Sequence, residues 1–200
     1  MSDDIKSARD IAFEKIAALD SATPDDRLKW KFTPEGEQLA IKYFKDGEDL
    51  TIVIAAYPAE AQPFVKSGAE KVLLDNIHLP YNDVVSARNK KAFDAMLYIK
   101  QDKAATTKTL EQIKHILGHY ADQGEVQRKE AHALLKQQFE AKIKQAVKAQ
   151  GGAADEETDL GINVTTMPQF QEELRRTITQ MDNQYLSLLD EYKRELRNIK

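Results

Sequence analysis

Residues 168–200 read PQFQEELRRTITQMDNQYLSLLDEYKRELRNIK, and this stretch decides the fold. Its apolar residues recur in alternating four- and three-residue steps, interrupted only at Glu195. They are Leu174, Ile178, Met181, Tyr185, Leu188, Tyr192 and Ile199. Such spacing places the side chains along one seam of a helix that packs against another helix, as in a coiled coil. At a rise of 1.5 Å per residue, this helix is about 45–50 Å long.

The natural partner of this helix is the stretch that precedes it, which is rich in Lys, Gln, Glu and Ala. Residues 106–120 and about 125–150 are expected to be helical, and Gly124 is expected to kink or interrupt the helix between them. The second stretch carries its apolar residues at Leu135, Phe139, Ile143 and Val147. The linker 151–166 carries four acidic residues and is long enough to turn the chain back. We therefore expect an antiparallel helical hairpin, although pairing of the same seam between two chains fits the pattern too.

Short helices are expected in the first half, which holds ten of the fifteen aromatic residues and every proline except Pro168. Residues 2–20 predict an amphipathic helix whose apolar positions follow three- and four-residue steps. These positions are Ile5, Ala8, Ala12, Ile16 and Leu19. Thr23-Pro24 and Thr33-Pro34 each have the form of a helix start, a capping hydroxyl followed by proline in the first turn. Gly47 is expected to end the second of these helices.

Residues 50–57, LTIVIAAY, are ambiguous because their β-branched content favours a strand. A lone strand among helices would leave its backbone groups without partners, so we predict a short buried helix, with a strand as the alternative. A further helix follows Pro58, and Pro63 within its first turns can delay the start. Asn82 or Asp83 is expected to cap the next helix, which runs to about residue 100.

The predicted fold is therefore all-α, with a bundle of short helices over residues 1–103 and a long antiparallel hairpin or coiled coil over residues 104–200. The chain has 200 residues, a formal charge of −4 and no cysteine, which excludes disulfides, thiolate metal sites and a cysteine nucleophile. No apolar run approaches the roughly 20 residues that span a bilayer. The first four residues, MSDD, are acidic where a signal or transit peptide would be basic. We expect a cytoplasmic protein without membrane contact.

Both ends of the chain carry short motifs that resemble a known group of sequences. The opening stretch holds IKSA from residue 5 and IAFEK from residue 11, and the closing stretch holds PQFQEE from residue 168 ahead of the heptads around Tyr185. The break IHLP at residues 77–80 adds to this pattern. Together they resemble a group of uncharacterised bacterial all-helical proteins. The resemblance implies a helical architecture and no particular activity.

A stripe of polar residues lies along one helical face at Glu111, His115, His119 and Asp122. Histidines four residues apart, with carboxylates one turn away, can bind zinc or iron. The stripe lies opposite the apolar face, however, and four ligands from one straight helix cannot surround an ion. We therefore predict a solvated polar face and no metal.

Two segments raise the possibility of nucleic-acid binding. The string RLKWKF at residues 27–32 interleaves basic and aromatic residues, as single-strand binders do, but it also fits a helix whose Leu28 and Phe32 pack inward. Residues 100–150 carry 10 basic and 6 acidic groups, and residues 151–200 carry 6 and 10. The two long helices are therefore expected to attract each other. A basic helix that follows a phosphate backbone is the alternative.

No catalytic or nucleotide-binding motif occurs, so we expect no enzyme and no cofactor. The preferred function is a protein–protein interaction or assembly protein that forms a homodimer or binds another protein. A nucleic-acid- or ribosome-associated factor that uses the basic helix of residues 100–150 is the alternative. Phe170 and Leu189 lie off the strict heptad seam of the last helix. They are the predicted partner-binding residues, because apolar groups outside a seam are free for another chain to cover.

Overall fold

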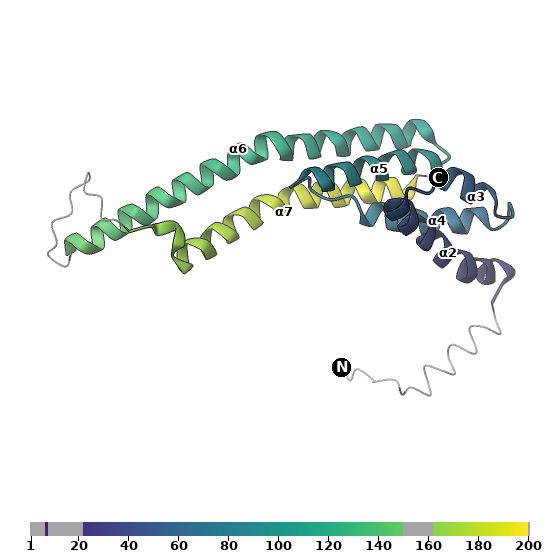
Figure 1. The fold of residues 1–200 in the computed structure, drawn as a ribbon, viewed down its shortest axis with the longest axis horizontal. Helices are drawn as coiled ribbons and strands as arrows, with labels where there is room; N and C mark the ends of the chain where they lie inside the picture. The colour runs from purple at the N-terminus through teal and green to yellow at the C-terminus, as the bar shows by residue number, and fades with distance from the viewer. Residues whose placement is uncertain (1–6, 8–21, 150–161, 200) are drawn as a thin grey trace. The chain divides into compact units, whose positions relative to one another are not determined.

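The computed structural model describes residue 7 and residues 22–149 and 162–199, and over these ranges the chain contains helices and no strand. The all-α prediction is confirmed. The elements are α2 (Pro24–Asp46), α3 (Leu50–Ala55), α4 (Gln62–Asp75), α5 (Asp83–Ile99), α6 (Lys103–Ala149), the 3₁₀ turn η1 (Val164–Thr166) and α7 (Pro168–Asn198) (Figure 1). The helix predicted for residues 2–20 and the linker residues 151–161 lie outside the described residues.

The described residues fall into two compact units. The first unit holds α2, α3, α4 and residues 88–101, and the second holds residues 78–87, α6, η1 and α7. No helix in the described ranges combines the length and the apolar content that a bilayer crossing requires.

Helix α2 begins as predicted with a capping box at Thr23. The backbone N–H of Asp26 donates to Thr23 Oγ1 (3.2 Å), and the backbone N–H of Thr23 donates to Asp26 Oδ2 (3.0 Å). These hydrogen bonds, above all the one from the Thr23 hydroxyl (2.6 Å), lower the pKa of the Asp26 carboxyl. The cap thus satisfies donors that the first turn of a helix leaves free.

The second start predicted at Thr33-Pro34 is wrong, because α2 continues through Pro34 as one helix of 23 residues. An interior proline costs a helix about 3 kcal/mol, so tertiary packing must offset this loss. That packing is a close crossing of α2 and α4. A Cβ added to Gly36 would collide with the Val65 carbonyl, and a Cβ added to Gly68 would collide with the Thr33 carbonyl. The two backbones therefore touch on either side of the proline.

Residues 50–55 form helix α3, as predicted, rather than a strand, but the helix is only partly buried because Ile52 is 70% exposed. Asp49 Oδ1 accepts a hydrogen bond from the backbone N–H of Thr51 (2.8 Å) and so caps the helix. Leu50 and Ile54, one turn apart, are its buried residues. The Tyr98 hydroxyl donates to the Thr51 carbonyl (3.0 Å) and ties α3 to α5. The side-chain cap outweighs the β propensity of this apolar run.

Helices α4 and α5 begin where a proline or a capping side chain permits. The helix expected after Pro58 begins later, at Gln62, with Pro63 in its first turn, which is the delayed start that this proline was expected to allow. Asn82 Oδ1 accepts from the backbone N–H of Val85 (2.9 Å), which confirms the predicted start of α5. Past the end of α5, Lys100 forms a buried ion pair with Glu70 of α4 at 2.8 Å.

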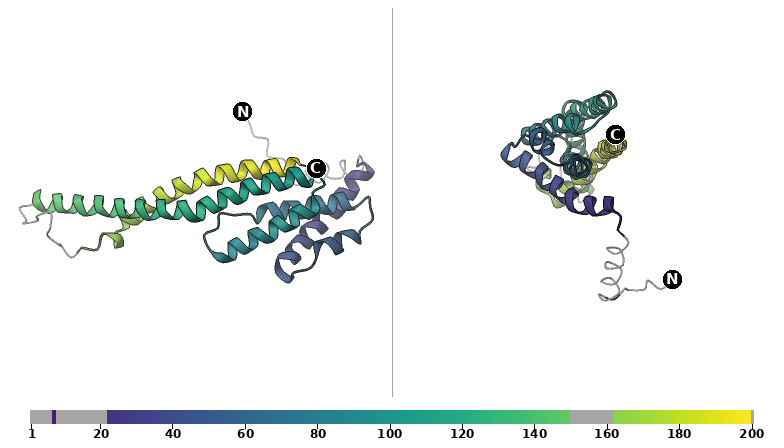
Figure 2. Two further views of the ribbon diagram at one scale, coloured as in Figure 1. Left: turned by 90° about the horizontal axis from the view of Figure 1, so that it is seen from above. Right: turned by 90° about the vertical axis from the view of Figure 1, so that its right-hand side faces the viewer.

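Helices α6 and α7 of the second unit run side by side and antiparallel (Figure 2). The Thr109 hydroxyl donates to Glu195 (3.1 Å), and ten residues further along α6 the His119 ring meets Tyr185, ten residues back along α7. The predicted hairpin therefore forms within one chain. Of the kink or interruption expected at Gly124, the interruption is wrong, because α6 is continuous over 47 residues. A Cβ on Gly124 would lie 3.1 Å from the Arg128 guanidinium, the end of a flexible side chain, and at an ordinary contact distance of 3.5 Å from the Tyr185 hydroxyl.

Candidate interaction groove between α6 and α7

The buried side of α7 differs from the predicted seam. Phe170 and Leu189 are each only 1% exposed, and Leu196 is fully buried. Leu188, which was predicted to lie in the seam, is 46% exposed. The prediction that Phe170 and Leu189 stand free for a partner is therefore wrong, because both side chains lie inside the unit.

The heptad prediction fails because the apolar step after Tyr185 is four residues long, to Leu189, rather than three residues long, to Leu188. The buried and half-buried apolar residues run from Leu174 to Leu196 with two four-residue steps in succession around Tyr185. Leu174, Tyr185 and Leu196 are thus separated by eleven residues each. A straight helix drifts by about 20° per heptad from a strict seven-residue repeat, and an extra four-residue step corrects the drift. Glu195, which interrupts the heptads, was the sequence signal for this shift.

Phe170 anchors the first turn of α7 on α6. Its ring is held between the rings of His132 and Phe139, each at a centroid distance of 5.5 Å and an interplanar angle of 85°. Edge-to-face contacts of this kind are favourable beyond the apolar area that they bury. His132 and Phe139 are seven residues apart, so they project from the same face of α6.

Tyr185 is the corresponding anchor near the middle of α7. Its hydroxyl lies 2.9 Å from His119 Nδ1, and its ring packs edge-on against Tyr120 at 5.1 Å. On α6, the Arg128 guanidinium lies 4.2 Å from the Tyr120 ring centroid and donates to the Tyr120 carbonyl (3.4 Å). Burial raises the pKa of the Tyr120 hydroxyl, and the negative charge of Asp182 raises it further. This cluster fixes the distance between the two helices at this point.

A groove of about 390 Å³ lies beside this cluster. It is lined by His115, Ile116, His119 and Gln127 of α6 and by Gln184, Tyr185 and Leu188 of α7. Ile116 is half-buried and Leu188 is 46% exposed, so its apolar side chains remain open to solvent. Its polar lining is formed by imidazole, amide and phenol groups.

Only two of the four residues in the polar stripe predicted on α6 line the groove. His115 and His119 line the groove, whereas Glu111 and Asp122 are exposed and do not line it. Among the described residues, no group of three His, Asp or Glu side chains is placed to hold a metal ion. The two histidines can donate or accept hydrogen bonds at the groove edge.

The basic and aromatic string on α2 belongs to the first unit, whereas the groove residues belong to the second. Leu28 and Phe32 are half-buried, as predicted, and Phe32 packs edge-on against Tyr57 at 5.9 Å. Lys31 Nζ lies 4.8 Å from the Phe32 ring centroid. Trp30 is 47% exposed, so it does not join the core.

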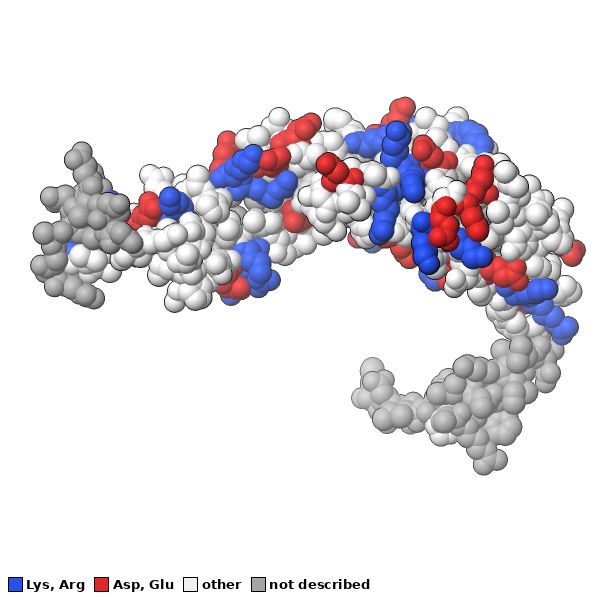
Figure 3. All heavy atoms as spheres, in the orientation of Figure 1, with Lys and Arg blue, Asp and Glu red and all other residues white. Residues whose placement is uncertain are grey.

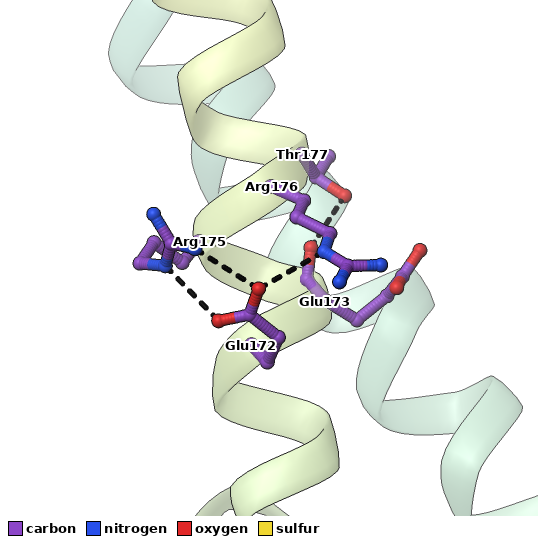
Figure 4. Close-up of polar contacts among 5 residues, drawn as sticks. All are labelled: Glu172, Glu173, Arg175, Arg176 and Thr177. Atoms are coloured by element: carbon purple, nitrogen blue, oxygen red, sulfur yellow. Dashed lines mark hydrogen bonds and ion pairs between the residues drawn. The ribbon is translucent and has the colours of Figure 1, made fainter.

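Charges of both signs are interspersed over the face shown in Figure 3. On α6, Lys129 pairs with Glu125 at 2.6 Å and Lys136 with Glu140 at 3.7 Å. On α7, Glu172 binds both Arg175 (2.9 Å) and Arg176 (3.0 Å), and these hydrogen bonds lower the pKa of Glu172 (Figure 4). These carboxylates are paired within their own helices, which reduces the charge that each helix presents outward.

Comparison with known protein families gives a match over most of the chain. A family of unknown function, DUF6657, matches residues 52–198, which include the whole of α4, α5, α6 and α7 and every residue of the groove. No curated protein and no solved structure matches the chain.

Proposed function

The chain belongs to DUF6657, a family of unknown function, and we propose that it is a non-enzymatic protein–protein interaction or assembly protein whose contact surface is the groove between α6 and α7. The observation that carries this proposal is the position of Leu188. A leucine that is 46% exposed lies within a groove whose other apolar residue is Ile116.

The composition of the groove suits protein recognition. Interfaces between proteins commonly have an apolar centre surrounded by polar groups that exclude water. Here Ile116 and Leu188 supply apolar surface, and His115, Gln127 and Gln184 supply hydrogen-bonding groups. A groove between two helices also accepts the apolar face of a third helix, which is a recurring mode of recognition.

The fixed wall of the groove supports the proposal further. Tyr185 is held by a hydrogen bond to His119 and by ring packing on Tyr120, so it loses little freedom when a partner binds. A surface that is ordered before binding lowers the entropic cost of association. In this proposal the partner is a second copy of the chain or another protein, and the setting is the cytoplasm of a bacterium.

Sedimentation velocity on the full chain, with and without proteins captured from the native host, tests the proposal. Leu188→Gln should weaken association by tenfold or more, on the order of 1.4 kcal/mol. Leu186→Gln is the matched control, because Leu186 is 40% exposed, lies on the same helix and does not line the groove. Both variants should keep the wild-type helix content by circular dichroism.

Two results would contradict the proposal. One is a chain that stays monomeric and captures the same proteins whether or not it carries Leu188→Gln. The other is salt-dependent retention on RNA without any protein association, since that behaviour belongs to a nucleic-acid-binding surface.

A further inference from the structure

A pocket of about 300 Å³ lies in the first unit, where residues of α2, α4 and α5 come together. Its lining residues are Ile41, Phe44 and Lys45 of α2, Val72 and Asn76 at the end of α4, and Arg88 of α5. Its volume equals that of about ten water molecules and is at the lower end of the range for small-molecule sites. The pocket therefore suits a ligand smaller than a nucleotide.

The apolar lining of this pocket is open to solvent. Ile41 and Phe44 are three residues apart and share a face of α2, and Val72 comes from α4. Ile41 is 46% exposed, and Phe44 and Val72 are half-buried. A ligand that covers these side chains gains free energy in proportion to the apolar area that it removes from water.

The charged lining of the pocket is wholly positive. Lys45 and Arg88 are both exposed and come from different helices, and none of the lining residues is acidic. Within the part of the chain that the structure describes, neither Lys45 nor Arg88 forms an ion pair. Two like charges on one pocket repel each other, and an anion bound by both removes this repulsion. A guanidinium beside an ammonium group is a donor set suited to a carboxylate.

The ends of the two helices at the pocket do not cancel this charge. The last turns of α2 and α4 contribute lining residues, and the carbonyl end of a helix carries about half a negative charge. Part of that charge is already satisfied, because the backbone N–H of Gly47 donates to the Tyr43 carbonyl (3.2 Å) and the Asn76 side chain donates to the Val72 carbonyl (2.8 Å). The two full positive charges therefore exceed the partial charges of the helix ends.

Contacts between the helices hold the walls of the pocket in place. The Tyr43 hydroxyl donates to the Lys91 carbonyl (2.9 Å), which ties the last turn of α2 to α5 close to Arg88. The Tyr43 ring lies 5.5 Å from the Phe44 ring. A site that is ordered before binding loses less entropy when a ligand enters.

We propose that this pocket binds a medium-chain monocarboxylate, with the carboxylate on Arg88 and Lys45 and the aliphatic chain on Ile41, Phe44 and Val72. The inference goes beyond the proposed function, because it concerns a small ligand and residues of the first unit. It does not depend on the groove between α6 and α7.

Binding of octanoate to the full chain, measured by isothermal titration calorimetry, tests the proposal. Octanamide has the same aliphatic chain without the charge and should bind about tenfold more weakly, since it loses the charge-assisted hydrogen bonds. Arg88→Gln should weaken octanoate binding by about tenfold for the same reason. Lys42→Gln is the matched control, because Lys42 is an exposed lysine of α2 that does not line the pocket, and it should leave the affinity unchanged.

Two further variants locate the bound octanoate. Ile41→Glu places a carboxylate in the pocket and should abolish binding, whereas Leu188→Gln alters the groove of the second unit and should have no effect. Circular dichroism checks that each variant keeps the wild-type helix content. The proposal is overturned if the wild type does not bind octanoate, if octanoate and octanamide bind equally, or if Leu188→Gln rather than Arg88→Gln removes the binding.

Discussion

Gly68 of α4 lies directly against the backbone of Thr33 in α2, so closely that a Cβ on Gly68 would collide with the Thr33 carbonyl oxygen. Thr33 immediately precedes Pro34, whose ring occupies the exposed side of α2. The closest approach of the two helices therefore coincides with the point at which the proline weakens α2. Gly68 could not be replaced by a residue with a side chain without moving a helix.

Gly68→Ala should lower the free energy of unfolding by about 1–3 kcal/mol or more, because the added methyl group must separate two backbones. Gly118→Ala is the control. Gly118 is also a helical glycine but has open space around its Cβ position, so this change should stabilise the chain by about 0.4–1 kcal/mol. Urea unfolding followed by circular dichroism measures both. A Gly68→Ala chain as stable as the wild type would show that α2 and α4 do not cross at this point.

The buried ion pair of the first unit gives a second prediction. The side chains of Lys100 and Glu70 are 5% and 17% exposed. Lys100→Met should cost about 3–5 kcal/mol, since it removes the Lys100 cation from a largely buried carboxylate. Lys100→Met combined with Glu70→Leu should recover much of that loss. Additive losses in the double variant, measured by the same unfolding assay, would contradict the pairing.

The burial pattern of α7 predicts opposite behaviour for two adjacent leucines. Leu189→Ala should lower the free energy of unfolding by about 2–5 kcal/mol, because it opens a cavity in the interior. Leu188→Ala removes a side chain that is 46% exposed and should cost well under half as much. If Leu188→Ala cost more than Leu189→Ala, Leu188 would lie in the interior, as the strict heptad seam predicts.

The capping box at Thr23 predicts a pH effect with a defined sign. The pKa of Asp26 is lowered in the folded chain by the hydrogen bonds from Thr23, so the cap stabilises the fold above the unfolded pKa of the carboxyl. This stabilisation is lost as the pH falls through the lowered pKa. Thr23→Val should raise the pKa of Asp26 toward its ordinary value, as carboxyl titration by NMR would show. An unchanged pKa would contradict the cap.

Much of the fold follows from local signals in the sequence. The helix starts marked by Thr23 and Asn82 were predicted, because each side chain caps a neighbouring backbone N–H. The continuity of α2 through Pro34 could not, because it depends on the contact with Gly68, far along the chain. The continuity of α6 through Gly124 could not be predicted either, because the low helix propensity of glycine argues against it.

The candidate site was predicted less well than the fold. The sequence placed His115 and His119 on one polar face, and the structure places both at the edge of the groove. It assigned Leu188 to the interior and Leu189 to the surface, and both assignments are reversed. A one-residue shift rotates a helix by about 100°, so a small error in the repeat changes which side chains meet solvent.

The spacing of Leu174, Tyr185 and Leu196 also determines how the hairpin is wound. Strict heptads wind two helices around each other with a left hand, whereas eleven-residue repeats, at about 3.67 residues per turn, favour a slight right hand. With this spacing, α7 has little tendency to coil to the left around α6. A matched insertion of eleven residues in each helix would therefore lengthen the hairpin and keep Phe170 and Leu189 on its inner side.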